Sequence, residues 1–159
     1  MIRLSSVISG TLCLAFTAAR AQTTSRNEAL PSWSQERWTA FAAAHDIKRS
    51  TRLTLSQLIG DFDRDGTTDV ALFVEQRTTH KQGIVFTHHA QTATIVVGAG
   101  VMLGDGGDDF EWVNRWSIRT PRATRARTRI DTLLLEHESS ASGIVYLLKG
   151  RYRWKQLGD

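Results

Sequence analysis

An acidic stretch that leads straight into an apolar run is the feature that most constrains how this chain can fold. Gly60 to Asp69 reads G-D-F-D-R-D-G-T-T-D, and Val70 to Val74 reads V-A-L-F-V. Gly and Asp favour tight turns, because glycine reaches positive φ and aspartate bonds nearby amides. An apolar run without alternation is typical of a buried central strand. The segment therefore predicts a turn that enters the middle of a sheet.

The aspartates of this turn have the spacing of calcium ligands. Asp61, Asp63, Asp65 and Asp69 take the first, third, fifth and ninth positions, and Gly66 takes the sixth. Calcium prefers six to eight hard oxygens, and glycine permits the sharp turn that would bring the carbonyl of Thr67 to the ion. The spacing predicts a calcium site made of five residues: Asp61, Asp63, Asp65, Thr67 and Asp69. The alternative is an acidic turn without a metal.

The loop does not follow the EF-hand pattern. An EF-hand needs flanking helices and a bidentate Glu at its twelfth position, which here is Leu72 inside the apolar run. The D-x-D-x-D-G-x-x-D stretch instead resembles the loops of FG-GAP repeat proteins, in which calcium sits between two strands. That resemblance implies a local calcium site. A propeller of that family needs several copies of the loop, and the chain has one.

Two later segments carry a wider resemblance. They are the stretch around Gly107-Asp-Asp-Phe-Glu-Trp112 and the ending Tyr152-Arg-Trp-Lys-Gln156 before Gly158-Asp159. Together with the single acidic loop, they resemble a group of small exported bacterial proteins of unknown function. The resemblance implies an exported domain and carries no activity with it.

The N-terminus has the features of a secretion signal. Arg3 supplies a positive start, Val7 to Ala19 is apolar, and Ala19-Arg20-Ala21 is a small-residue cleavage site. The apolar stretch falls short of the roughly 20 residues of a membrane-spanning helix. We therefore expect residues 1–21 to be cleaved and the protein to be periplasmic or extracellular. A retained N-terminal anchor is the alternative, and no later span is expected in the mature chain.

The remaining residues predict one domain over 32–159, after a polar leader at 22–31. Ser32 and Gln35 fit a capping box for a helix from Trp33 to His45, with His45 at the edge of the core. Apolar and β-branched runs then predict strands at 53–59, 70–74, 83–87, 93–97, 130–135, 143–148 and 151–156. The expected fold class is α+β, with one N-terminal helix and a mostly antiparallel sheet of six to seven strands.

A second acidic segment lies between residues 98 and 116. Asp105, Asp108 and Asp109 could form another cation site or a polar pocket beside Trp112 and Trp116. The favoured interpretation is a structured loop whose aspartates bond nearby backbone amides. The alternative is an envelope glycan or peptide hydrolase that uses Asp108, Asp109 or Glu111.

The charge and histidine patterns exclude few classes of function, and they do not favour an enzyme. The chain has 20 Lys and Arg against 16 Asp and Glu, a balance too weak to indicate nucleic-acid binding. Arginines crowd residues 119–129 and could meet an anionic surface; they are Arg119, Arg122, Arg125, Arg127 and Arg129. His88 and His89 are adjacent, so on a strand they would face opposite sides and would not ligate one metal together. Neither a nucleophile elbow nor an H-E-x-x-H motif is present.

From the sequence we therefore expect an exported, calcium-stabilised structural or binding module, monomeric or weakly oligomeric, with a protein or glycan as its ligand. Cys13, in the predicted signal, is the single cysteine, so the mature chain would have no disulfide. A bound ion would then contribute to folding, because a ligand of the native state adds its binding free energy to stability.

Overall fold

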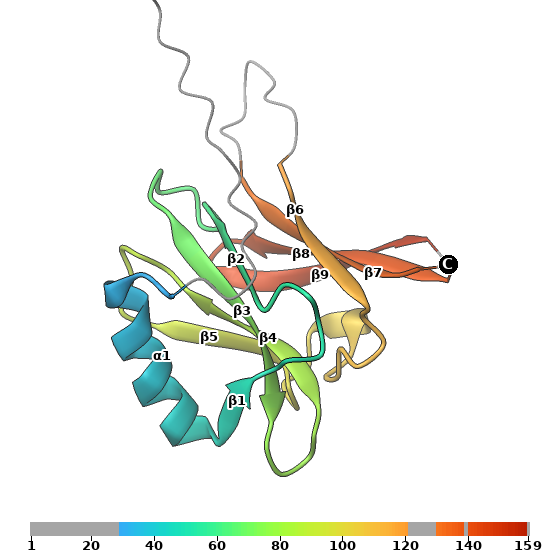
Figure 1. The fold of residues 1–159 in the computed structure, drawn as a ribbon. Coiled ribbons are helices and arrows are strands. Elements are labelled where there is room, and N and C mark those ends of the chain that lie inside the picture. Colours follow the sequence, from blue (N-terminus) through green and yellow to red (C-terminus); the bar gives the residue numbers. More distant parts are fainter. Residues whose placement is uncertain (1–28, 121–129, 139, 159) are drawn as a thin grey trace, which may run out of the picture.

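The computed structural model describes residues 29–120, 130–138 and 140–158 (Figure 1). The predicted signal peptide at 1–21, most of the polar leader, and the arginines from Arg122 to Arg129 lie outside the described residues. Within the described ranges, no helix combines the length and the apolar character needed to cross a membrane.

The helix α1 spans Ser32–His45, one residue longer than predicted. The predicted capping box is wrong. Pro31 takes the N-cap position, and its carbonyl accepts hydrogen bonds from the amides of Ser34 and Gln35 at 2.8 and 3.0 Å. Proline suits a helix start because its missing N–H would have no intrahelical acceptor there and its φ is already fixed. The Gln35 side chain donates to Thr39 along the helix instead of reaching back.

His45 does not sit at the edge of the core as predicted. It is exposed in the last turn of α1 and lies against Phe41, with ring centroids 4.1 Å apart. Ile47, two residues further on, fills the apolar contact beneath the helix and is 3% exposed.

In the described residues, nine strands form two antiparallel sheets, which confirms the α+β class and exceeds the predicted six to seven strands. The first sheet has the order β1-β3-β4-β5, with β2 also paired to β3. Its strands are β1 Ile47–Arg49, β2 Gln57–Gly60, β3 Asp69–Gln76, β4 Gln82–Thr87 and β5 Thr94–Gly98. The second sheet has the order β6-β7-β8-β9, with β6 Arg115–Arg119, β7 Thr132–His137, β8 Ala141–Leu148 and β9 Arg151–Gly158.

Two strands were not predicted, and one was predicted to begin too early in the sequence. β1 and β6 are short and rich in charged residues, so neither carries a clear strand pattern. The strand predicted from residue 53 begins only at Gln57. Ser50 donates to the carbonyl of Phe73 and the amide of Phe73 donates to Ser56, so residues 51–55 leave the edge of β3 between β1 and β2.

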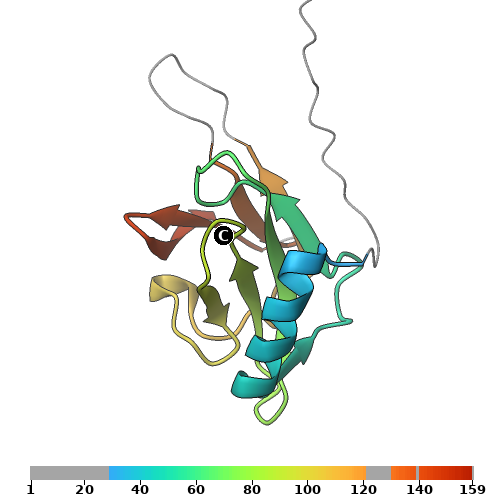
Figure 2. The ribbon, with the colours of Figure 1, turned by 90° about the vertical axis from the view of Figure 1, so that its left-hand side faces the viewer.

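The strand β3 lies at the centre of three layers. Figure 2 shows α1 along one face of the first sheet, and the second sheet packs on the opposite face. Val70, Leu72 and Val74 belong to the apolar cluster on the helix side, whereas Ala71 and Phe73 belong to the cluster between the sheets. Because both faces of β3 are covered, its apolar run has no polar alternation. The prediction of a buried central strand is confirmed.

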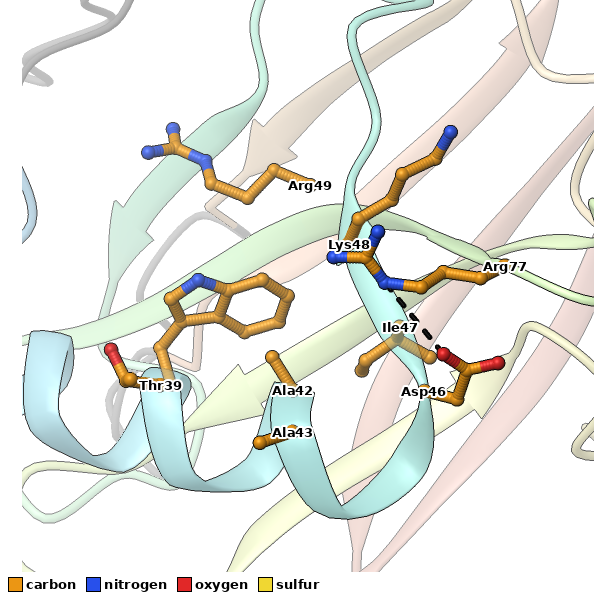
Figure 3. A pocket seen from close by; sticks show the side chains of 9 residues that line it. Thr39, Ala42, Ala43, Asp46, Ile47, Lys48, Arg49 and Arg77 are labelled. Carbon is orange, nitrogen blue, oxygen red and sulfur yellow. Dashed lines mark ion pairs between the residues drawn. The ribbon is translucent and has the colours of Figure 1, made fainter.

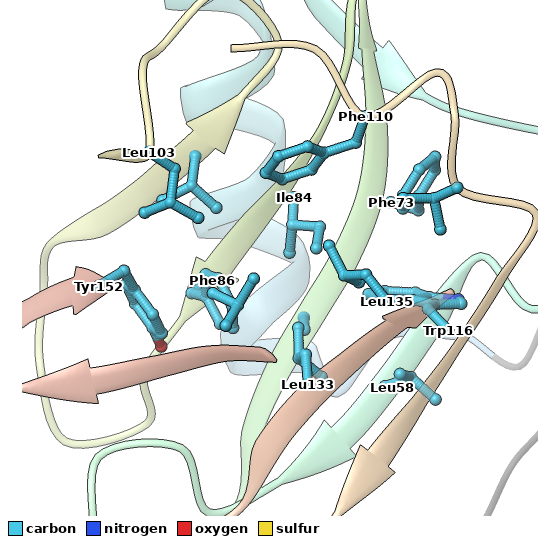
Figure 4. Close-up of a cluster of buried hydrophobic side chains, with 14 of the residues drawn as sticks. Leu58, Phe73, Ile84, Phe86, Leu103, Phe110, Trp116, Leu133, Leu135 and Tyr152 are labelled. Carbon is cyan, nitrogen blue, oxygen red and sulfur yellow. The ribbon is translucent and has the colours of Figure 1, made fainter. Parts of the chain in front are cut away.

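The larger core fills the space between the two sheets (Figure 4). Phe86 of β4 stacks on Tyr152 of β9 with ring centroids 3.8 Å apart, and Phe73 meets Trp116 edge to face at 5.4 Å. Burying each such side chain contributes about 1.5–3 kcal/mol. Tyr152 also brings β9 to the end of β4, where the acidic turn lies.

Candidate metal centre

The acidic turn joins β2 to β3 and closes tightly, since Gly60 pairs with Asp69 across the two strands. Two of its residues have left-handed backbone conformations, Arg64 at φ 71° and Gly66 at φ 83°. Glycine adopts this conformation without strain, whereas arginine does so at a cost. The amides of these two residues donate to the two carboxylate oxygens of Asp61 at 2.9 and 3.1 Å.

Three of the predicted ligands converge at this turn. Asp61, Asp63 and Asp65 each offer a carboxylate oxygen, and these oxygens lie within 4.8 Å of one another. Thr67 lies beside them and donates its hydroxyl and its amide to Asp65 Oδ1 at 2.5 and 2.6 Å. Within the described ranges, no Lys or Arg forms an ion pair with any of the three carboxylates. A cation could therefore be the charge that balances them.

Asp69 lies apart from this outer group. Its side chain is fully buried, and its two oxygens accept hydrogen bonds from the amides of Phe62 and His89 at 2.8 and 3.0 Å. Its neighbours in ligand distance are Asp63 and His88, not Asp61 and Asp65. The structure thus divides the four predicted aspartates between an outer group and an inner one, with Asp63 in both.

His88 belongs to the inner group, although no local sequence pattern places it there. Its side chain is fully buried, with Nδ1 3.0 Å from Asp69 Oδ2 and 3.6 Å from Asp63 Oδ2. Its Nε2 lies 3.1 Å from the hydroxyl of Tyr152. His89 is exposed and packs on Trp33, so the two histidines do lie in different surroundings. The missing information was register: Val70 pairs with Thr87, which brings the next residue, His88, beside Asp69.

The turn after β4 holds both His88 and Asp63 in place. Arg37 of α1 reaches across and donates to the carbonyls of His88, His89 and Gln91. The Gln91 side chain in turn donates to Asp63 Oδ2 at 2.7 Å. Helix, turn and acidic loop are therefore linked through charge-assisted hydrogen bonds, which are stronger than neutral ones.

The second sheet fixes the other side of the acidic loop. Asp131, just before β7, accepts the amide of Asp61 at 3.0 Å and donates its own amide to the carbonyl of Asp61 at 3.0 Å. The hydroxyl of Thr120 donates to the remaining oxygen of Asp131 at 2.6 Å. The first ligand position is thus held by residues distant in the sequence.

The electrostatics of the site reflect these contacts. Burial, together with the charges of Asp69 and Asp65, raises the pKa of Asp61 against the lowering effect of its two amide donors. The hydroxyl and amide of Thr67 lower the pKa of Asp65. Burial and the nearby charges of Asp69 and Asp63 raise the pKa of the Tyr152 hydroxyl far above its ordinary value. Tyr152 therefore stays protonated beside His88.

The second acidic segment has a different arrangement. Asp108 pairs with Lys81 at 2.5 Å, and Asp109 Oδ1 accepts the amides of Gln82 and Glu111 at 2.9 and 3.0 Å. Asp105 is exposed in the short 3-10 helix η1, Gly104–Gly106. Across the described ranges, the groups of residues close enough to share a metal do not include these aspartates. Trp116 is buried in the core, with its indole N–H donating to the carbonyl of Leu55.

A hollow of about 510 Å³ lies between α1 and β1 (Figure 3). Its cationic side chains have partners. Lys48 pairs with Glu75 at 3.1 Å, Arg77 pairs with Asp46 at 3.7 Å, and Arg49 donates to Gln57 at 3.0 Å. Carboxylates therefore neutralise two of the three cations, and Arg49 is bonded to a neutral side chain.

Comparisons with known proteins add no relative. No protein-family model matches the chain, and neither the curated proteins nor the solved structures contain a match. The likeness to FG-GAP loops and to small exported proteins therefore stays a prediction, and the chemistry of the site has to be argued from its own residues.

Proposed function

We propose that this protein is an exported structural or binding module whose acidic loop holds a calcium ion. The observation that carries the proposal is the convergence of Asp61, Asp63 and Asp65 without a Lys or Arg partner within the described ranges. Converging carboxylates repel one another, and a divalent cation relieves that repulsion. Oxygen-only ligands on a tight loop suit calcium, since magnesium keeps more of its waters.

The ion would stabilise the fold because the loop is bonded to two elements that lie far apart in the sequence. Its first residue is bonded to Asp131 near β7, and its third is bonded to Gln91 in the turn after β4. A ligand present at a hundred times its dissociation constant adds about 2.7 kcal/mol to stability. That is a substantial share of the total for a domain of this size. The partner we expect for the stabilised module is a protein or a glycan.

The test is a thermal melt of the purified protein after metal stripping, with calcium, with magnesium and with neither. We expect calcium to raise the melting temperature by several degrees and magnesium to raise it little. Asp65→Asn should remove the calcium response, because this carboxylate is exposed and is one of the proposed ligands. Asp105→Asn, an equally exposed aspartate outside the loop, is the control and should keep the response. A melting temperature unaffected by calcium would refute the proposal.

Export has a separate test. Cleavage after Ala21 would leave Gln22 as the first residue of the mature protein. N-terminal sequencing of protein recovered from the periplasm or the medium should begin at Gln22. Recovery of the uncleaved chain in the membrane fraction would favour the retained anchor.

A further inference from the structure

The inner group of the acidic turn presents two buried carboxylates to one imidazole. The side chains of Asp69 and His88 are fully buried, and that of Asp63 is 4% exposed. In the described part of the chain, no Lys or Arg forms an ion pair with either carboxylate. Two buried negative charges therefore face a ring that carries at most one positive charge. Buried charges are normally paired or bound to a metal.

The Nδ1 atom of His88 is the second observation, and it is independent of the acidic residues. It is inaccessible to solvent and makes no hydrogen bond to any described residue. Asp69 Oδ2 lies only 3.0 Å away, but the approach lacks hydrogen-bonding geometry. Nδ1 and the carboxylate oxygens are thus close together without bonding to one another, as ligand atoms around a shared ion are.

From this arrangement we propose that Asp63, Asp69 and His88 form a buried binding site for a borderline transition-metal ion of the zinc class. Ligands about 2.0–2.2 Å from a tetrahedral zinc ion stand roughly 3.3–3.6 Å from one another. The distances from Nδ1 to the two carboxylate oxygens, 3.0 and 3.6 Å, lie close to that range. An imidazole nitrogen suits zinc and its neighbours, whereas calcium prefers oxygen.

The surroundings of His88 support this role. With Nδ1 bound to the metal, Nε2 carries the proton and donates to the Tyr152 hydroxyl, 3.1 Å away. Metal-bound histidines usually donate their second ring nitrogen in this way, which fixes the tautomer and the ring orientation. The two ligand oxygens are also oriented, Asp63 Oδ2 by Gln91 and Asp69 Oδ2 by the amide of Phe62.

This site does not depend on the calcium proposal. Asp61 and Asp65 belong to the outer group alone, and Asp69 and His88 belong to the inner group alone. Asp63 belongs to both groups, so Asp63→Asn should lower the affinity for both ions. The two proposals can therefore fail separately.

The test is a zinc titration of the metal-stripped full-length protein, labelled with nitrogen-15 in its histidine rings and followed by NMR. We expect one zinc ion to bind and to shift the Nδ1 signal of His88, while its Nε2 keeps its proton. Tyr152→Phe should lower zinc affinity about tenfold, as loss of such a partner does, while its ring still stacks on Phe86. His88→Gln should abolish this binding, and His89→Gln should preserve it.

Three results would overturn the proposal. One is a wild-type protein that binds no zinc. Another is zinc that shifts only the signals of exposed histidines such as His89. The third is a His88 ring with both nitrogens protonated that stays so in excess zinc, which would show an ion pair with Asp63 and Asp69 in place of a metal site. Because the wild-type NMR result decides all three, the proposal stays testable even where His88→Gln fails to fold. Asp61→Asn, which should lose calcium and keep zinc, shows which ion each group binds.

Discussion

Two acid-rich segments of this protein have similar compositions and opposite environments. In the loop from Asp61 to Asp69, the carboxylates face one another, and none of them pairs with a Lys or Arg of the described chain. In the segment from residue 98 to 116, Asp108 pairs with Lys81, and Asp109 accepts two backbone amides. The first arrangement brings three carboxylates together without a cationic side chain, whereas in the second Asp108 has a cationic partner and the aspartates do not form a group close enough to share a metal.

The two segments also differ in how they are held. The segment from residue 98 to 116 is held by packing. Phe110 is fully buried, and Trp154 lies against Gly106 and Gly143, where a Cβ would come within 2.7 and 2.0 Å of its ring. The acidic loop also anchors one ring in the core, that of Phe62, but its aspartates are held by hydrogen bonds. In this protein, acidic residues near glycine therefore indicate an ion site only where they cluster without a cationic partner.

The largest effect should come from the packed segment. Phe110→Ala would leave a cavity in the core between the sheets and should reduce the free energy of unfolding by about 3–5 kcal/mol. Urea unfolding with and without calcium measures this change. The calcium-dependent gain should be the same as in the wild type. Loss of that gain would show that the two segments are energetically coupled and would contradict their separate roles.

The next effect should come from the acidic loop. In Asp61→Asn, the calcium-linked gain of about 2.7 kcal/mol at a hundred times the wild-type dissociation constant should disappear. Asp108→Asn is the matched control, because it removes a carboxylate that already has a cationic partner. Calorimetric melts with and without calcium would compare them. Equal calcium responses in the two variants would contradict the distinction drawn here.

A smaller effect should come from the link between the helix and the acidic loop. Arg37→Met keeps the apolar stem but removes the hydrogen bonds to the carbonyls of His88, His89 and Gln91. We expect a loss of about 2 kcal/mol, typical of hydrogen bonds from a charged group. Denaturant unfolding would measure it, with Arg151→Met on the exposed start of β9 as the control. Equal stability of the two variants would show that Arg37 does not fasten the loop.

The smallest effect concerns a carboxylate that has partners. Hydrogen bonding from His80 and the nearby Lys48 lower the pKa of Glu75, opposite to the shift at Asp61. A lowered pKa in the folded protein means that this stabilisation is present above the ordinary pKa, 4.5, and is lost as pH falls through the lowered value. Glu75→Gln should therefore cost about 0.2–1 kcal/mol at pH 7 and less in acid. A cost that grows on acidification would mean that the pKa of Glu75 is raised in the folded protein and not lowered.

Much of the fold follows from local pattern. The helix begins beside a proline, and β3 and the C-terminal strands contain runs of neighbouring apolar or β-branched residues, so the α+β class could be predicted. The short charged strands β1 and β6 could not, since pairing with β3 and β7 defines them and local pattern does not. The predicted capping box was also wrong, because Pro31 starts the helix without any side-chain cap.

The crowding of aspartates in a glycine-containing turn follows from the sequence alone, because spacing along a short loop fixes which side chains can meet. The tertiary fold turns Asp69 inward, places His88, just after β4, against it, and places Tyr152 of β9 against His88. It also decided that Asp108 finds Lys81, 27 residues away. Whether a carboxylate has a partner depends on strand register and sheet packing, and these bring together residues that no local pattern connects.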